Sequence, residues 1–209
     1  MGDKLFFKQV REFDDLASKL ILTSAKNGFF NINGNNSSIG VRGSDEKIVF
    51  EAIKKAGEDY TYKPTFVDPS CGQGIPLVLS AKMGYDTYGS DIENGIVKIT
   101  NKLILNLEKK NVIPKGNIKK IIQGDLLDLK TYNSLGVDFS DVDIFYNYTF
   151  RSIQKHFFHL FSDSAKQGAK LIHIPGYKKI KRNSLLDLMD NIELFYEHPE
   201  NIYQIYTKK

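Results

Sequence analysis

Three aspartates, Asp68, Asp91 and Asp125, each follow a β-prone segment of the sequence. Acids at the carboxyl ends of parallel strands face the crevice in which open α/β sheets bind ligands. One such acid fits a surface turn equally well. Three in succession, each in the same context, predict a binding site for a polar ligand.

The segment after Asp68 has the composition of a ligand-binding turn. Gly72 and Gly74 stand between a predicted strand, residues 65–67, and an apolar pattern over residues 75–83 that is typical of a helix. Glycines at this position let a ligand approach the backbone, and the N–H groups at the start of the helix point toward it. We therefore expect residues 68–74 to contact the ligand directly.

The distance between the first two acids fits a nucleotide. Asp91 follows Asp68 by 23 residues and closes the predicted strand 86–90. In nucleotide-binding βαβ units, an acid about 20 residues further along the chain binds the ribose hydroxyls. A strand, a turn with two glycines, a helix and a second acid in this order predict a cofactor that contains a nucleoside.

Strand and helix patterns alternate along most of the chain. Besides the helix at 75–83, helical patterns cover residues 95–110 and 153–166. The predicted strands are residues 65–67, 86–90, 118–123, 142–148, 169–174, 192–197 and 202–207. The last two strands are joined by so short a turn that they must be antiparallel. The predicted fold class is α/β: a Rossmann-like, seven-stranded, mostly parallel sheet with a C-terminal antiparallel hairpin and helices on both faces.

A further segment precedes this core. Residues 1–26 have apolar residues at helical spacing, and residues 28–43 are rich in Gly, Asn and Ser, which is typical of a mobile surface loop or of a lid. Ser44 resembles the start of a helix. We predict an N-terminal helical and loop cap, residues 1–43, and a main domain, residues 44–209.

Composition excludes several classes of protein. The chain has 209 residues, of which 41% are hydrophobic, enough for one α/β domain with a full core. The net charge of +4 is too small to indicate nucleic acid by itself. We find no apolar run long enough for a membrane span and no signal-peptide pattern. Cys71 is the only cysteine, which excludes an intrachain disulfide, so we expect a cytoplasmic protein without a membrane partner.

Two other features of the sequence do not define a site. His156 and His159 lie one helical turn apart, but no further ligand stands at the spacing that a metal needs, so no metal site is predicted. Residues 178–182 contain a basic cluster that fits either a solvated face or a contact with an anion.

The second half of the chain distinguishes between nucleotide-binding classes. A dinucleotide-dependent dehydrogenase needs a third glycine near Leu77 and repeats βαβ units to its end, and this chain does neither. The order of elements from residue 44 to 207 resembles instead the class I methyltransferases that use S-adenosylmethionine, whose seven-stranded sheet ends in an antiparallel hairpin. Asp68, Gly72 and Gly74 match the turn of that family, and Ser70 stands where the family often has its first glycine.

This resemblance implies S-adenosylmethionine as the cofactor and assigns a role to each strand end. Asp91 matches the acid that binds the ribose hydroxyls, and Asp125 with Leu126 matches the adenine-binding step. Asn147 matches the end of the fourth strand, beside the reactive methyl group. The implied cofactor-binding residues are Ser44, Asp68, Ser70, Gly72, Gly74, Asp91, Ile92, Asp125, Leu126 and Asn147.

Two resemblances compete within the class. The sequences DPSCGQG and YGSDIE are similar to RNA and DNA methyltransferases that modify exocyclic base amines, but those enzymes carry two prolines after the Asn or Asp of strand four. Asn147-Tyr148-Thr149-Phe150 is similar instead to the Asn-aromatic-Ala-Phe sequence of non-SET protein lysine methyltransferases. The sequence IGVRGSDEKIVFEAI is also similar to the segment ahead of their first strand, which makes Gly43 and Ser44 candidate cofactor-loop residues.

The implied activity is methyl transfer to an amine of a macromolecule, with protein favoured over nucleic acid. Asn147 and Tyr148 are the candidate catalytic residues, because a carbonyl can orient an amine and an aromatic face suits the cationic sulfonium. Two alternatives stay open at this point. One is a base-amine methyltransferase, and the other is a non-catalytic binding subunit with a methyltransferase fold.

Overall fold

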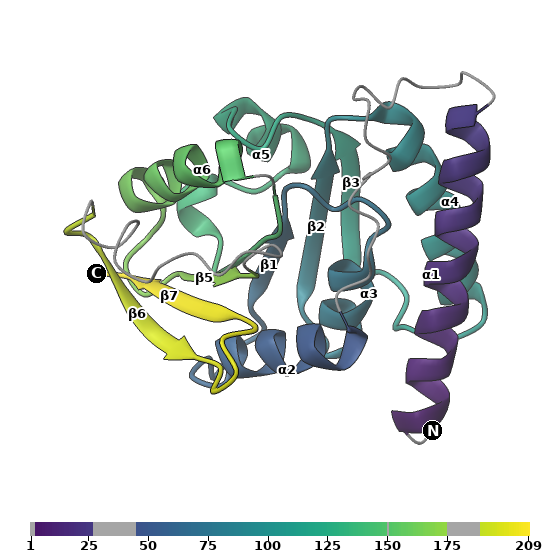
Figure 1. The fold of residues 1–209 in the computed structure, drawn as a ribbon, viewed down its shortest axis with the longest axis horizontal. Coiled ribbons are helices and arrows are strands. Elements are labelled where there is room, and N and C mark those ends of the chain that lie inside the picture. Colours follow the sequence, from purple (N-terminus) through teal and green to yellow (C-terminus); the bar gives the residue numbers. More distant parts are fainter. Residues whose placement is uncertain (1–2, 27–44, 150, 175–188) are drawn as a thin grey trace.

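The computed structural model of the chain describes residues 3–26, 45–149, 151–174 and 189–209. A seven-stranded sheet lies at its centre (Figure 1), with the strand order β3-β2-β1-β4-β5-β7-β6. The strands are β1 (Thr65–Asp68), β2 (Asp86–Asp91), β3 (Ile118–Gln123), β4 (Ile144–Asn147), β5 (Lys170–His173), β6 (Ile192–Glu197) and β7 (Gln204–Lys208). Strands β1 to β5 pair in parallel, and β7 pairs antiparallel with both β5 and β6. The predicted fold class is confirmed.

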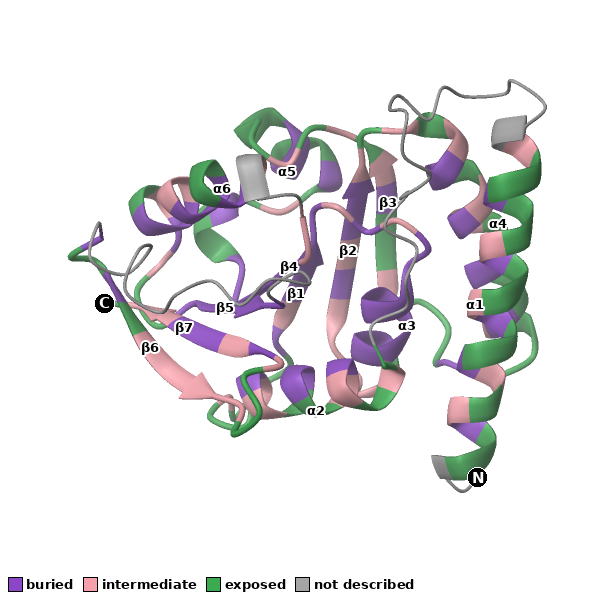
Figure 2. Ribbon diagram, viewed as in Figure 1, coloured by how far each residue is buried: buried purple, intermediate pink, exposed green. Residues whose placement is uncertain are grey.

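Helices cover both faces of the sheet, and each face has its own core. The buried sides of α2 (Glu46–Gly57), α3 (Ile75–Lys82) and α4 (Asn94–Lys109) share one hydrophobic cluster. The buried sides of α5 (Leu129–Leu135) and α6 (Arg151–Ser164) belong to the other. Successive strand residues alternate between them, as when Phe145 enters the second cluster and Tyr146 the first. Every residue of β4 and β5 is buried, and β1 is buried except at Thr65 (Figure 2), as expected for strands covered on both faces.

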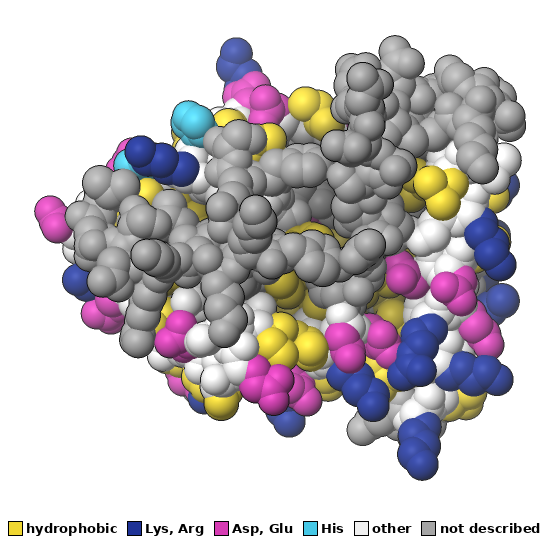
Figure 3. Space-filling model, viewed as in Figure 1, with side chains coloured by type: hydrophobic (Ala, Val, Ile, Leu, Met, Phe, Trp, Pro, Cys, Tyr) yellow, Lys and Arg dark blue, Asp and Glu magenta, His cyan; other side chains and the backbone are white. Residues whose placement is uncertain are grey.

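The N-terminal segment forms a single helix, α1 (Asp3–Lys26), in the region where the apolar spacing predicts helix. It packs against α4, α3 and α2 outside the sheet (Figure 1). Its buried residues recur every three or four positions: Phe6, Val10, Phe13, Ala17 and Ile21. Its outer side carries both signs of charge (Figure 3), including an ion pair between Lys8 and Glu12. The division at residue 43 stays a prediction, because residues 27–44 lie outside the described part.

Several sequence-based boundaries need correction. Helix α5 and the short 3-10 helix η1 (Phe139–Asp141) were not predicted. Strand β4 is shorter than the predicted 142–148. Asp143, just before it, accepts hydrogen bonds through its carboxylate from Thr65 N (2.7 Å) and Tyr62 Oη (2.6 Å). Helix α2 begins at Glu46 and is capped by Asp45, whose side chain accepts from Lys47 N, one residue after the start predicted at Ser44.

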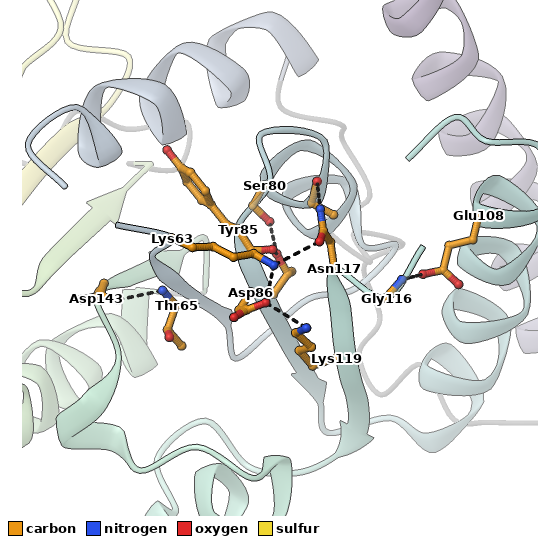
Figure 4. A network of polar contacts seen from close by, with 12 residues as sticks. Lys63, Thr65, Ser80, Tyr85, Asp86, Glu108, Gly116, Asn117, Lys119 and Asp143 are labelled. Carbon is orange, nitrogen blue, oxygen red and sulfur yellow. Dashed lines mark hydrogen bonds and ion pairs between the residues drawn. The ribbon is translucent and has the colours of Figure 1, made fainter. Parts of the chain in front are cut away.

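A polar network fixes the amino ends of the first three strands (Figure 4). Asp86 at the start of β2 forms ion pairs with Lys63 (2.6 Å) and Lys119 (3.0 Å). Asn117 accepts from Lys63 Nζ and donates to the carbonyl of Ala81 at the end of α3. The charged groups at this edge therefore pair with one another. None of the described helices combines the length and the apolarity that crossing a bilayer requires.

Candidate active site

The turn after β1 has two glycines that serve different purposes. Gly74 caps α3 with φ +83°, and a Cβ there would lie 2.8 Å from Thr100 Cγ2 of α4. Gly72 has φ +48°, and a Cβ there would meet no atom closer than 4.0 Å. Gly74 thus permits close packing of α3 against α4. Gly72 leaves open space beside the backbone, which is what the approach of a ligand requires.

Hydrogen bonds fix the turn to the end of β2. Cys71 N donates to Ser90 O (2.8 Å), and Gly72 N donates to Asp91 Oδ2 (3.0 Å). On the other side, Thr100 Oγ1 donates to Gly72 O (2.8 Å). Burial raises the pKa of the Cys71 thiol, as expected for a small packing residue and not for a nucleophile.

Asp91 keeps acceptor capacity for a ligand. Its Oδ1 accepts from Glu93 N (2.9 Å) and its Oδ2 accepts from Gly72 N (3.0 Å). Burial raises the pKa of this carboxyl, and this effect outweighs the two hydrogen bonds from N–H groups, which lower it. A carboxylate offers about four acceptor positions, so each oxygen retains one. Asp91 can therefore accept from two neighbouring hydroxyls without losing its own contacts.

Asp68 is the most buried acid of the site, with 1% of its surface exposed. Burial raises its pKa to about 8, and the nearby Asp91 adds to the rise, whereas a hydrogen bond from Ser70 N (3.2 Å) opposes it. Ser70 Oγ is itself buried and has no partner in the part of the chain that the structure describes. Both groups are available to a polar ligand at the turn.

The ends of β2 and β3 are joined at the predicted adenine step. Gly124 N donates to Asp91 O (3.0 Å), and Tyr132 Oη of α5 holds the carbonyl of Leu126 (2.8 Å). Asp125 is exposed, and its Oδ1 accepts from Leu127 N (2.9 Å).

Ile92 presents its side chain to solvent directly after Asp91, with 64% of its surface exposed. An exposed isoleucine and a half-buried leucine at neighbouring strand ends suit the two faces of an aromatic ring.

The structure separates the two candidate catalytic side chains. Asn147 is fully buried, and its Oδ1 accepts from Thr149 Oγ1 (2.8 Å). Because strand residues alternate, it lies on the same face as Phe145, toward α6. Tyr148 is half-buried and packs against the cluster on the opposite face. Ser44, Gly43, residues 28–43 and the basic cluster at 178–182 lie outside the described residues.

Four residues that the sequence did not single out complete the site. Thr100 donates a hydrogen bond to the carbonyl of Gly72. Gln73 joins the turn to α1. When its side-chain amide is oriented so that both its oxygen and its nitrogen have partners, it donates to Asp14 Oδ1 (2.7 Å) and accepts from Ser18 Oγ (2.5 Å). The signal for this contact was available, because Asp14 and Ser18 border the apolar stripe of the first helix. The other two, Gln154 and His173, have no such signal.

Comparison with models of known protein families finds no match for this sequence, and comparison with curated proteins finds none either. Solved structures with the same fold do exist. Magnesium protoporphyrin IX methyltransferase from Synechocystis, with bound S-adenosylmethionine, aligns with 94% of this chain and 97% of its own, at 14% identity and a TM-score of 0.58.

Two further structures agree with it. An RNA methyltransferase from Salinibacter ruber, in complex with S-adenosylhomocysteine, aligns with 78% of this chain and 90% of its own, at 17% identity and a TM-score of 0.52. A TehB-like methyltransferase from Corynebacterium glutamicum aligns with 94% of this chain and 98% of its own, at 14% identity and a TM-score of 0.52. The chain has the fold of the class I S-adenosylmethionine-dependent methyltransferases.

Proposed function

We propose that this protein is an S-adenosylmethionine-dependent methyltransferase that transfers a methyl group to an amine of a macromolecule, with protein lysine as the favoured acceptor. The observation that carries the proposal is the arrangement around Gly72. Its N–H contacts Asp91, its other side is open, and Asp68 lies at the end of the strand that precedes it.

The residues present fit the cofactor. Asp91 has two acceptor positions for a ribose diol, and Ile92 and Leu126 provide apolar surface for adenine. Asp68 and Ser70 Oγ would receive the amino acid portion, whose ammonium favours the ionised form of a neighbouring carboxyl. When bound, S-adenosylmethionine supplies an electrophilic methyl group on a cationic sulfur.

The protein's own contribution is positioning and the exclusion of water. The acceptor nitrogen gives its lone pair to the methyl carbon while the bond from that carbon to sulfur breaks, and the methylated nitrogen then loses a proton to water if it is to become neutral. Asn147, at the end of β4, is placed to orient that nitrogen. Tyr148 lies on the other face of the sheet and would contact the acceptor as it approaches the site.

Local sequence supports lysine as the acceptor. Asn147-Tyr148-Thr149-Phe150 has the aromatic residues of the lysine methyltransferases and lacks the prolines of the base-amine enzymes. A base amine of nucleic acid is the second candidate, because the turn DPSCGQG is similar to those enzymes and a structural neighbour is an RNA methyltransferase.

Calorimetric titration with S-adenosylmethionine tests the cofactor assignment. We expect binding by the wild-type chain and at least ~10-fold weaker binding by Asp91→Asn, since hydrogen bonds to a charged group contribute about 1.5–3 kcal/mol. Asp163→Asn makes the same chemical change at an exposed position of α6 and should leave the affinity unchanged. Failure of the wild-type protein to bind would reject the proposal.

Incubation with radiolabelled cofactor and a cell extract tests the acceptor. We expect label in protein that survives nuclease treatment and that appears as methyllysine after hydrolysis. Label in nucleic acid would favour the second candidate. Asn147→Ala should abolish transfer while S-adenosylmethionine binding persists, and unchanged transfer would remove Asn147 from the chemistry.

A further inference from the structure

Three buried side chains at the carboxyl ends of β4 and β5 carry polar atoms that nothing in the described structure satisfies. Asn147 ends β4, His173 ends β5, and Gln154 lies near the start of α6; their exposed fractions are 0%, 1% and 2%. The unpartnered atoms are Asn147 Nδ2, Gln154 Oε1 and both ring nitrogens of His173. Each such atom costs about 1–3 kcal/mol, so native interiors contain few of them.

The three side chains form one cluster. Asn147 and His173 are opposite each other in the parallel register of β4 and β5, so they leave the sheet on the same face. Thr149 connects two members, since its Oγ1 donates to Asn147 Oδ1 (2.8 Å) and its carbonyl accepts from Gln154 Nε2 (2.8 Å). Phe158, one helical turn after Gln154, packs edge-on against His173 with ring centroids 5.2 Å apart. We call Asn147, Gln154 and His173 the β4–β5 polar cluster.

The cluster is uncharged near neutral pH. Burial lowers the pKa of His173 to about 4, so its imidazole is neutral, and the other two members are amides. Asp68, on the neighbouring strand β1, follows Val67, which pairs with Phe145, so its side chain leaves the sheet on the face opposite to Asn147 and does not face the cluster. Lys155 and His156, next to Gln154 on α6, are exposed and lie away from its buried side.

Neutral acceptors suit an amine that has lost its charge. If the Asn147 amide turns over, Nδ2 donates to the Thr149 hydroxyl and Oδ1 becomes free, because a hydroxyl both donates and accepts. With Gln154 Oε1 and one ring nitrogen of His173, the cluster then offers three acceptors. A neutral amine has two N–H groups to satisfy and keeps its lone pair for the methyl carbon. An ammonium would leave its hydration shell without meeting a carboxylate, which is costly.

We propose that the β4–β5 polar cluster binds the methyl-accepting amine in its uncharged form, with Asn147 and Gln154 accepting its N–H groups and His173 contributing a neutral wall that disfavours ammonium ions. This inference rests on the proposed function. The ammonium form gives its proton to water before it enters, so the cluster needs no catalytic base. The acceptor is then a primary alkylamine, such as the lysine side chain, that is uncharged when it binds to the cluster.

Two amines of nearly equal shape test the inference at pH 7.5. Fluorine substitution makes 2,2,2-trifluoroethylamine so weakly basic that it is uncharged at this pH, whereas ethylamine is an ammonium ion. Binding to the protein, with and without S-adenosylhomocysteine, is followed by NMR through the ring signals of His173, which are assigned by their loss in His173→Gln. We expect trifluoroethylamine to bind at least ~10-fold more tightly, because burial penalises the charged form. Equal or tighter binding of ethylamine, or His173 signals that neither amine shifts, would overturn the proposal.

Gln154→Glu places a carboxylate in the cluster and should reverse the preference toward ethylamine. Asn147→Asp introduces the same charge from the strand, in case the first variant does not fold, and should also favour ethylamine. Gln167→Glu makes the matched change at an exposed position after α6 and should preserve the wild-type preference. Absence of S-adenosylhomocysteine binding contradicts the proposed function, whereas cofactor binding without any amine preference contradicts only the role of the cluster.

Discussion

Gln73, between the two glycines of the turn, hydrogen-bonds to Ser18 of α1 across 55 positions of sequence. Its side chain is buried, with 7% of its surface exposed, and its amide also reaches Asp14 when both ends are given partners. Helix α1 is further attached to the start of α2 by an ion pair between Arg11 and Glu46. The N-terminal helix is thereby joined directly to the turn that we propose binds the cofactor, so its docking and the shape of the turn depend on each other.

Gln73→Ala should weaken S-adenosylmethionine binding by about 5-fold, because one buried hydrogen bond contributes about 1 kcal/mol to keeping the turn in place. Calorimetric titration measures the effect. Ser18→Ala should act in the same direction. Lys8→Ala removes an exposed ion pair within the same helix, worth ~0–1 kcal/mol, and serves as the control. Equal affinity in Gln73→Ala and wild type would show that α1 and the turn are independent.

Gly74→Ala should destabilise the protein by about 2–4 kcal/mol. The new Cβ would lie 2.8 Å from Thr100 Cγ2, and a φ of +83° is strained for any residue with a Cβ. The double variant Gly74→Ala with Thr100→Ser removes the methyl group but keeps the hydroxyl that bonds Gly72 O. It should recover part of the loss in chemical denaturation. No recovery would mean that backbone strain alone accounts for the cost.

The parts of this fold that local pattern controls were predictable. Asp68 and Asp91 end their strands because acids are poor strand interiors, and the apolar run after Gly74 can only be a buried helix between them. The C-terminal hairpin followed from the short turn near residue 199. These features depend on residues close in sequence, and they were enough to predict the sheet and the edge at which we propose that it binds the cofactor.

The rest depends on contacts between distant residues. Helix α5 is short and has few apolar positions, and it is stabilised mainly by Tyr132, which packs against Phe139 and Phe145 in the second core. The β4–β5 polar cluster arises because β5 pairs beside β4, which places His173 opposite Asn147. No spacing in the sequence encodes that register, so neither His173 nor Gln154 could be singled out before the sheet order was known.

Asp68→Asn should change how stability depends on pH. The folded-state pKa of Asp68 is raised to about 8 from an ordinary 3.8, so its stabilising contribution is complete below pH 3.8 and is lost as the pH rises through 8. Asp68→Asn cannot ionise, so it does not lose stability in this way as the pH rises. Its stability relative to wild type should therefore rise between pH 4 and pH 8.5 by ~1–4 kcal/mol, measured by urea denaturation. Asp163→Asn, at an exposed site, should show no such trend. A constant difference across this range would contradict burial of an ionisable Asp68.

His173 should affect stability in the opposite direction. Burial lowers its pKa in the folded state to about 4 from 6.5, so the folded protein resists protonation and the unfolded chain does not. The stabilisation is present above pH 6.5 and is lost as the pH falls toward 4. His173→Gln keeps a donor and an acceptor but cannot titrate, so wild type should lose ~1–3 kcal/mol relative to this variant between pH 7 and pH 4.5, measured by urea denaturation. His156→Gln changes an exposed histidine of α6, and its stability should follow that of wild type across the same pH range.

If wild type and His173→Gln lose stability in parallel, then water or a counter-charge reaches the imidazole. The β4–β5 polar cluster would then not be the neutral environment that selects an uncharged amine.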